Sequence, residues 1–90
     1  MLFMVIEHFR NRDAVAVYRR FREQGRMLPD GLKYIESWTT DNFERCFQLM
    51  ECDDPLLFQQ WVARWEDLIE FEIIPVVLSK EAAEAITPML

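Results

Sequence analysis

The sequence has few of the residues on which common catalytic and cofactor-binding motifs depend. It contains only two glycines, Gly25 and Gly31, and a single histidine, His8. A phosphate-binding loop needs several closely spaced glycines, so this chain cannot form one. No CxxC or HxxxH spacing occurs, and one histidine is too few for the common zinc sites. We therefore expect no metal ion and no cofactor.

Long apolar runs are also missing. The longest aliphatic stretch, residues 73–78, contains Pro75 and is far too short to span a bilayer. The opening MLFMVIEHF has no basic residues before its apolar part, and Glu7 interrupts that part. It resembles a buried strand more than a signal peptide, so we expect a cytoplasmic protein with no membrane partner.

The chain has two cysteines, Cys46 and Cys52, which lie in one expected strand. Six residues of extended chain place them roughly 20 Å apart, whereas a disulfide needs Cα atoms within about 7 Å. They cannot pair with each other, and two reduced thiols fit the cytoplasm.

Positive charge is scarce outside the first part of the chain. Residues 1–26 hold six arginines and three acidic residues, and residues 27–90 hold four basic and thirteen acidic residues. The net charge of −6 should repel nucleic acid. Arg19, Arg22 and Arg26 share one face of an expected helix, but the aromatic residues of that helix belong to its apolar stripe. We expect a solvated face and no nucleic-acid partner.

What the sequence does have is clear alternation and helical spacing. Strands are expected at residues 2–9, 32–39, 45–52 and 69–78. A helix capped by Asn11 or Asp13 should stop at Gly25, and a second should begin at Asp53 or Asp54 with Pro55 in its first turn. A tail helix over residues 80–86, capped by Ser79, should end before Pro88.

This order of elements predicts one domain over residues 1–90. It is a ferredoxin-like βαββαβ unit of the α+β class, with right-handed crossovers and an antiparallel sheet in the order 4-1-3-2. Both main helices should then cover the same face of the sheet.

The strand RCFQLMEC has no water-facing side, because both of its alternating sets carry apolar residues. Two helices cover only one face of four strands, and the tail helix is too short to cover the other. The economical solution is a homodimer in which two sheets pack face to face as a dimeric α/β barrel. A small molecule is then expected between the two sheets.

The topology brings chemically useful residues to one edge of the sheet. His8, Trp38, Arg45 or Cys46, and Glu70 or Glu72 should meet where two strands end and two begin. His8 with Glu72 is the minimum for acid–base chemistry, and Glu36 and Gln48 should lie deeper if the hairpin register allows. The ligand-binding candidates are therefore Trp38, Glu36, Cys46 and Gln48.

Three functions remain open at this point. The first is a small-molecule-binding barrel, and the second is a small monooxygenase-like or isomerase-like enzyme that uses His8 with a carboxylate. The third is a purely structural or interaction module. The sequence does not say whether the protein is an enzyme.

Four segments are together typical of a known family: LFMVIEHF, YIESW, RCFQLMECDDP and WVARWEDLIEFEIIPV. On these segments, which span roughly residues 1–80, the chain resembles a bacterial family of short proteins known only as a domain of unknown function. The resemblance implies a dimeric α/β barrel and no catalytic residues. More distant barrel relatives include antibiotic-biosynthesis monooxygenases and haem-degrading enzymes. The haem-degrading type carries a ligating histidine on its second helix, where this chain has none, so haem is not expected.

Overall fold

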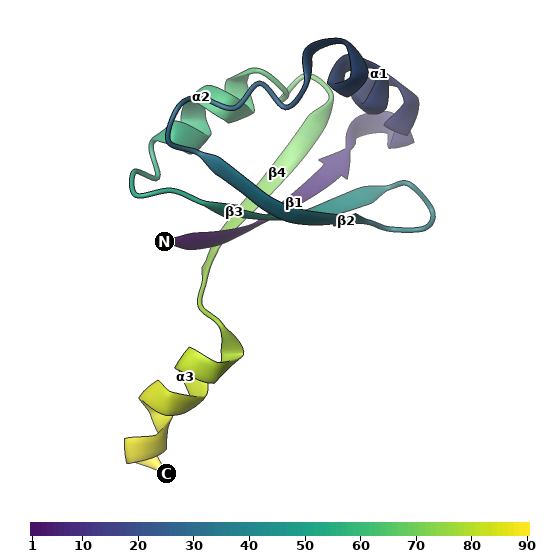
Figure 1. Cartoon of the computed structure of the whole chain (residues 1–90). Coiled ribbons are helices and arrows are strands. Elements are labelled where there is room, and N and C mark those ends of the chain that lie inside the picture. Colours follow the sequence, from purple (N-terminus) through teal and green to yellow (C-terminus); the bar gives the residue numbers. More distant parts are fainter.

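The computed structural model describes all residues from 1 to 90 as a four-stranded sheet, two helices on one of its faces and a third helix that stands apart (Figure 1). The strands are β1 (Leu2–Phe9), β2 (Lys33–Thr39), β3 (Arg45–Glu51) and β4 (Ile69–Val76). The α-helices are α1 (Ala14–Gln24), α2 (Leu57–Ala63) and α3 (Ser79–Ile86). Short 3₁₀ helices, η1 (Arg10–Arg12) and η2 (Thr87–Met89), precede α1 and follow α3.

The sheet has the predicted ferredoxin-like topology. Its strand order is β2-β3-β1-β4, and every neighbouring pair is antiparallel. This is the order 4-1-3-2 read from the other edge. Helices α1 and α2 lie on the same face (Figure 1), as right-handed crossovers require. We call this the covered face, and the opposite one the open face.

The core fills the space between the covered face and the two helices. Strand β1 alternates strictly, with Phe3, Val5, Glu7 and Phe9 buried and the residues between them half-buried. Trp61 on α2 and the following Trp65 are also buried, at 1% and 4% exposure. Burial of such large side chains is the main source of stability here, and each contributes several kcal/mol, of the order of 3–5 by alanine substitution.

The hairpin register, which the sequence could not decide, depends on an irregularity in β2. Tyr34 pairs with Met50, but Glu36 pairs with Leu49, so one extra residue of β2 lies between them. Such a bulge reverses which side chains face the helices. Beyond it, Ser37 and Thr39 lie on the covered face, beside Gln48 and Cys46, whereas Glu36 and Trp38 lie on the open face.

The predicted ends of α1 are confirmed. Asp13 accepts a hydrogen bond from the Ala16 amide at 3.1 Å, and Gly25 ends the helix with a φ of 70°, a conformation that favours glycine. The predicted start of α2 was too early: the helix begins at Leu57, and Leu56 occupies the capping position without a side-chain hydrogen bond. Asp54 instead accepts a hydrogen bond from the Leu56 amide in the turn that contains Pro55 and precedes the helix.

The predicted cap of the tail helix was wrong. Ser79 is the first helical residue, and Leu78 occupies the capping position without a side-chain hydrogen bond. Leu78 is extended, with φ −62° and ψ 142°, so the chain leaves β4 nearly straight before α3 begins. As a result α3 lies away from the sheet, on the side opposite α1 and α2 (Figure 1).

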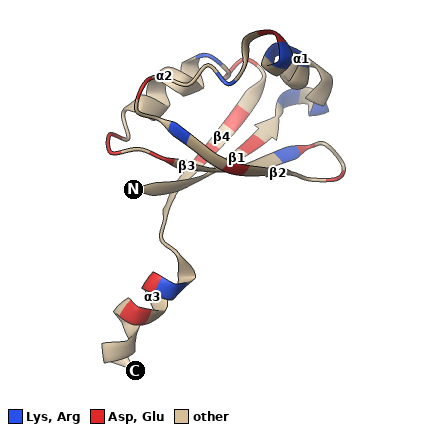
Figure 2. Cartoon of the chain, in the orientation of Figure 1, with Lys and Arg blue, Asp and Glu red and all other residues tan.

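The prediction that Arg19, Arg22 and Arg26 share one face of a helix was also wrong. Arg19 and Arg22 lie on α1, but Gly25 turns the chain before Arg26, whose side chain bends inward to Gln48. The other arginines of this region gather around α1 (Figure 2), where Arg20 pairs with Asp67 at 2.6 Å and Arg12 with Glu44 at 3.5 Å. No helix in the structure has the length and hydropathy needed to span a bilayer.

Candidate functional site

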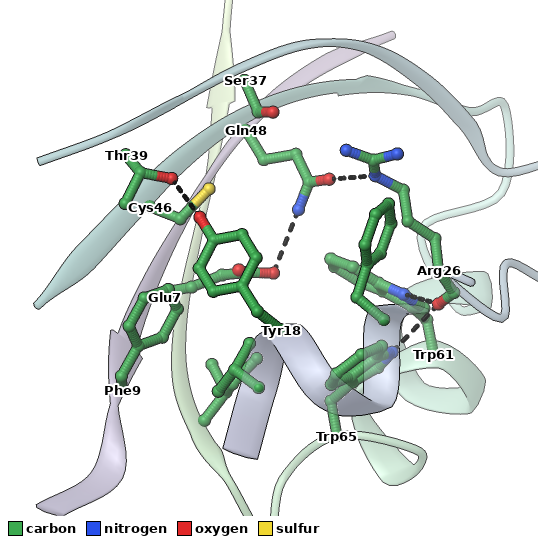
Figure 3. Close-up of a pocket in the computed structure, with 13 residues that line it drawn as sticks. Glu7, Phe9, Tyr18, Arg26, Ser37, Thr39, Cys46, Gln48, Trp61 and Trp65 are labelled. Carbon is green, nitrogen blue, oxygen red and sulfur yellow. Dashed lines mark hydrogen bonds between the residues drawn. The ribbon is translucent and has the colours of Figure 1, made fainter. Parts of the chain in front are cut away.

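A pocket opens between α1 and the covered face of the sheet (Figure 3). It encloses about 100 Å³ and is bordered by 13 residues, of which 8 are hydrophobic. The apolar wall comes from Phe9 at the end of β1, from α1, from α2 with its following turn, and from the start of β4. The polar floor comes from the sheet and from the loop after α1: Glu7, Arg26, Ser37, Thr39 and Gln48, with the Cys46 thiol among them.

Three charged or amide side chains form a continuous hydrogen-bonded chain along this floor. The Arg26 Nε donates to the Gln48 Oε1 at 2.8 Å, and the Gln48 Nε2 donates to the Glu7 Oε2 at 3.0 Å. Glu7 and Gln48 are only 7% and 3% exposed. Gln48 therefore lies between the buried Glu7 carboxylate and the Arg26 guanidinium and links the two groups, which are not directly bonded to each other.

The position of Arg26 depends on both tryptophans of the core. The Nε1 groups of Trp61 and Trp65 each donate to the Arg26 carbonyl oxygen at 2.9 Å. The guanidinium lies 3.5 Å from the ring centre of Tyr34 and 4.9 Å from that of Phe21. This stacking leaves the outer nitrogens of Arg26 without a protein hydrogen-bond partner and available to a ligand.

Burial changes the acidity of Glu7. Loss of water raises the pKa of its carboxyl from the ordinary value of 4.5 to about 7, although the nearby Arg26 and the Gln48 amide oppose this shift. A group with this pKa can both accept and donate a proton at neutral pH, which is the property needed for acid–base chemistry.

Cys46 of β3 lies beside Glu7, its register partner on β1. Burial, and to a lesser degree the negative charge of Glu7, raise the pKa of its thiol to about 11. Burial also raises the pKa of the Cys52 thiol, and neither cysteine is in a disulfide, as predicted. At neutral pH Cys46 therefore lines the pocket as a neutral thiol. Because the thiolate is the nucleophilic form, Cys46 is not an activated nucleophile.

The mouth of the pocket is spanned by Tyr18. Its ring is 45% exposed, and its hydroxyl shares a 2.7 Å hydrogen bond with the Thr39 hydroxyl of β2 (Figure 3). This bond joins α1 to the sheet over the polar floor. Rotation of one exposed side chain would therefore enlarge the opening without disturbing the core.

The open face carries the remaining candidates from the sequence. The His8 Nε2 lies 3.5 Å from the Glu72 Oε1, and both side chains are substantially exposed. His8 lies in one cross-strand row with Arg45 and Glu70, and Glu72 lies in the next row. Of the predicted edge cluster, the structure therefore brings together His8, Arg45, Glu70 and Glu72. Trp38 is on the same face but on β2, two strands from His8, and Cys46 faces the other way.

The structure divides the four predicted ligand-binding residues between two sites. Cys46 and Gln48 line the pocket, whereas Glu36 and Trp38 are exposed on the open face. Sequence reasoning did not identify Glu7 as a pocket residue, although its place among Phe3, Val5 and Phe9 on one side of a strand was a signal of burial. Nor did it identify Arg26, because the pattern of arginines suggested one helix face.

No group of three or more His, Cys, Asp and Glu side chains is arranged to hold a metal ion.

The fold and the pocket together define a small ferredoxin-like α+β protein with an internal polar site. The chain belongs to the family described as Domain of unknown function (DUF3303), which matches it over residues 1–90. No curated protein matches the sequence. The crystal structure of protein Atu4242 from Agrobacterium tumefaciens, a structural-genomics target, is similar in fold, with a TM-score of 0.50 at 9% identity over 87% of this chain and 95% of that one.

Proposed function

We propose that this protein is a homodimer whose protomers each bind one small molecule in the pocket between α1 and the sheet. Two sheets packed through their open faces would form the dimeric α/β barrel. The ligand site is then inside each protomer, on the helix side of the sheet, and not between the two sheets.

The arrangement of the open face supports the dimer. Its central rows are apolar, and its charged residues lie at the margins, which is the usual organisation of a protein interface. Trp38, at 54% exposure, Ile35 and Ile74 are the most exposed of the large apolar residues on the sheet. The apolar centre consists of Leu2, Met4, Ile6, Phe47, Leu49, Ile74 and Val76, and the charged margin of Lys33, Glu36, Arg45, Glu51, Glu70 and Glu72.

The main support for a binding pocket is the row of hydrogen-bonded side chains from Glu7 through Gln48 to Arg26. A buried carboxylate with a raised pKa opposes folding at neutral pH, and an apolar residue of similar size would not. Such groups are concentrated at functional sites, particularly where they line a cavity. Here the carboxylate lies on the floor of a pocket whose mouth a single tyrosine spans.

The lining indicates the chemical class of the ligand. The aromatic and aliphatic wall favours an apolar or aromatic body, and the floor offers a proton acceptor, Glu7, and a cation, Arg26, on either side of Gln48. A ring with one weakly acidic group fits both features. The volume of about 100 Å³ admits only a small fragment while Tyr18 is bound to Thr39, so larger ligands require Tyr18 to move.

Binding of small probes tests this proposal. Benzoate and phenol would be titrated into the protein at pH 6 and pH 8, with the signals of Trp61 and Trp65 followed by fluorescence and all amides by NMR. We expect saturable changes confined to the pocket, with a pH dependence near 7 that is lost in Glu7→Gln. Glu70→Gln on the open face is the matched control and should retain it.

One observation favours an enzyme as the second candidate. His8 and Glu72 lie within 3.5 Å of each other on the open face, in a position to exchange a proton with a molecule held between two sheets. In that case probe-induced changes would centre on His8 and not on Glu7. Complete absence of probe binding at either place would favour the third possibility, a structural module, and would contradict the pocket proposal.

The proposed partner is therefore a second copy of the chain together with a small molecule, without nucleic acid. The proposed compartment is the cytoplasm, which suits two buried, unpaired thiols.

A further inference from the structure

The last part of the chain stands apart from the rest of the protomer (Figure 1). Residues 77–90, which we call the C-terminal arm, are all exposed. The arm includes α3 and η2 and projects from the end of β4 beyond the open side of the sheet (Figure 1). An isolated helix of eight residues is only marginally stable in water, so an arm of this kind needs a surface to pack against.

The sequence of the arm provides one apolar side for such packing. The residues at helical spacing on this side are Ala82, Ala85 and Ile86 of α3 and Met89 of η2, together with Leu78 at the capping position, and we call them the arm stripe. Ile86 is 52% exposed and Met89 is 82% exposed. By the same helical spacing, the polar residues Lys80 and Glu84 lie on the opposite side, and Glu81 flanks the stripe.

We propose that the C-terminal arm of each protomer packs its apolar stripe against the second copy of the chain, so that two arms are exchanged in the dimer. This inference rests on the proposed dimer. In a two-fold dimer, each arm packs on the other copy, so both stripes are buried. No unoccupied arm or arm-binding surface is left to bind a third chain.

Position and area both favour the second copy as the occupant. The arm lies on the side of the sheet where the proposed partner would sit, and the extended Leu78 directs it away from its own protomer. Four strands about 4.8 Å apart present roughly 400 Å² in projection, and more as accessible surface, whereas stable interfaces bury about 800 Å² of accessible surface per partner. Two exchanged arms would add apolar area to this contact between the sheets.

The charge of the arm argues against a membrane as the occupant. Helices that lie in a membrane surface are usually rich in lysine and arginine on their polar side. This arm has one lysine against two glutamates and would be repelled by anionic lipid.

The test compares two double variants of the full chain by sedimentation equilibrium over a range of protein concentrations. Ile86→Glu with Met89→Glu places two charges on the arm stripe, and Ala83→Glu with Thr87→Glu places the same two charges on the opposite side. We expect the stripe variant to raise the dimer Kd by about tenfold or more, as loss of central apolar contacts does. The control should change it by about twofold at most.

Four results would overturn the inference, and they are distinguishable. Equal Kd values for both variants would show that the arm is not part of the interface, although the dimer exists. If the unmodified chain is a monomer, both the proposed dimer and the arm exchange are wrong. If the stripe variant melts at a lower temperature, and by the same amount at every protein concentration, then the arm folds back on its own chain. Binding to phosphatidylcholine vesicles that the stripe variant loses, with its Kd unchanged, would identify a membrane surface instead.

Discussion

The covered and open faces of the sheet are built from the same four strands, yet they differ in what their polar residues do. On the covered face, the polar residues Glu7 and Gln48 are buried within an apolar surround. On the open face the pattern is reversed, since apolar residues form the centre and charges form the margin. The first arrangement is typical of an internal site, and the second is typical of a surface that a partner covers.

The largest expected effect is on the free energy of unfolding, when a tryptophan on each face is replaced by alanine. Trp61→Ala should lower the free energy of unfolding by about 3–5 kcal/mol, because it removes a buried ring and leaves a cavity. Trp38→Ala, on the open face, should lower it by less than about 1 kcal/mol at protein concentrations that keep the chain monomeric. Urea denaturation measures both. Equal losses would contradict the contrast between the faces.

The second prediction breaks the open face without disturbing the core. Met4 is half-buried at its centre, directly between Leu49 and Ile74, and Glu36, the acidic residue of its row, lies beyond Leu49 on the edge strand. Met4→Arg should weaken dimerisation by about a hundredfold or more, because it buries an unpaired charge at the interface. Val15→Arg, on the exposed side of α1, is the control. A protomer that unfolds on Met4→Arg, as shown by circular dichroism, would mean that this face is part of the core.

The third prediction concerns the pH dependence caused by Glu7. The folded protein holds this proton more tightly than the unfolded chain does, so ionisation of Glu7 destabilises the fold. Its contribution to stability is therefore favourable below pH 4.5 and is lost as the pH rises through about 7. Glu7→Gln should be more stable than the unmodified protein at pH 8, by roughly 2–3 kcal/mol, and the difference should vanish near pH 4.

This difference is measured by denaturation of both proteins at equal concentration, with Glu70→Gln as the exposed control. The pocket account would be wrong about Glu7 if the variant were less stable than the unmodified protein at pH 8.

The smallest effect is expected outside both faces. Arg19 and Arg22 are exposed on α1, and neither takes part in an ion pair. Changing both to glutamine should shift the melting temperature by a few degrees at most and leave dimerisation unchanged, because exposed charges contribute only about 0.2–1 kcal/mol each. Tight, salt-sensitive binding of the unmodified protein to DNA or RNA would contradict this reading of the arginines.

The fold could be predicted from the sequence because its signals are local and repeated. Alternation in LFMVIEHF, the cap at Asp13 and the stop at Gly25 each define an element, and the rules for crossovers then leave few topologies. The strand ends were predicted to within two residues. The free cysteines followed from their spacing alone.

The site could be predicted only in part because it depends on the β2 bulge and on a single loop residue. The extra residue between Tyr34 and Glu36 reverses the faces of the second strand, and no local pattern marks its place. It separates Glu36 and Trp38 from Cys46 and Gln48. Arg26 enters the pocket because the chain turns at Gly25 and both tryptophans hold its carbonyl, which are tertiary contacts that a helical pattern does not reveal.

The mass of the unmodified protein in solution tests the central claim, that the open face is covered by a second copy of the chain. Sedimentation equilibrium at micromolar concentration should give about 22 kDa, twice the chain mass of 10.9 kDa, and Met4→Arg should return the mass to that of one chain. A folded protein that remains at 10.9 kDa across the micromolar range would contradict the account.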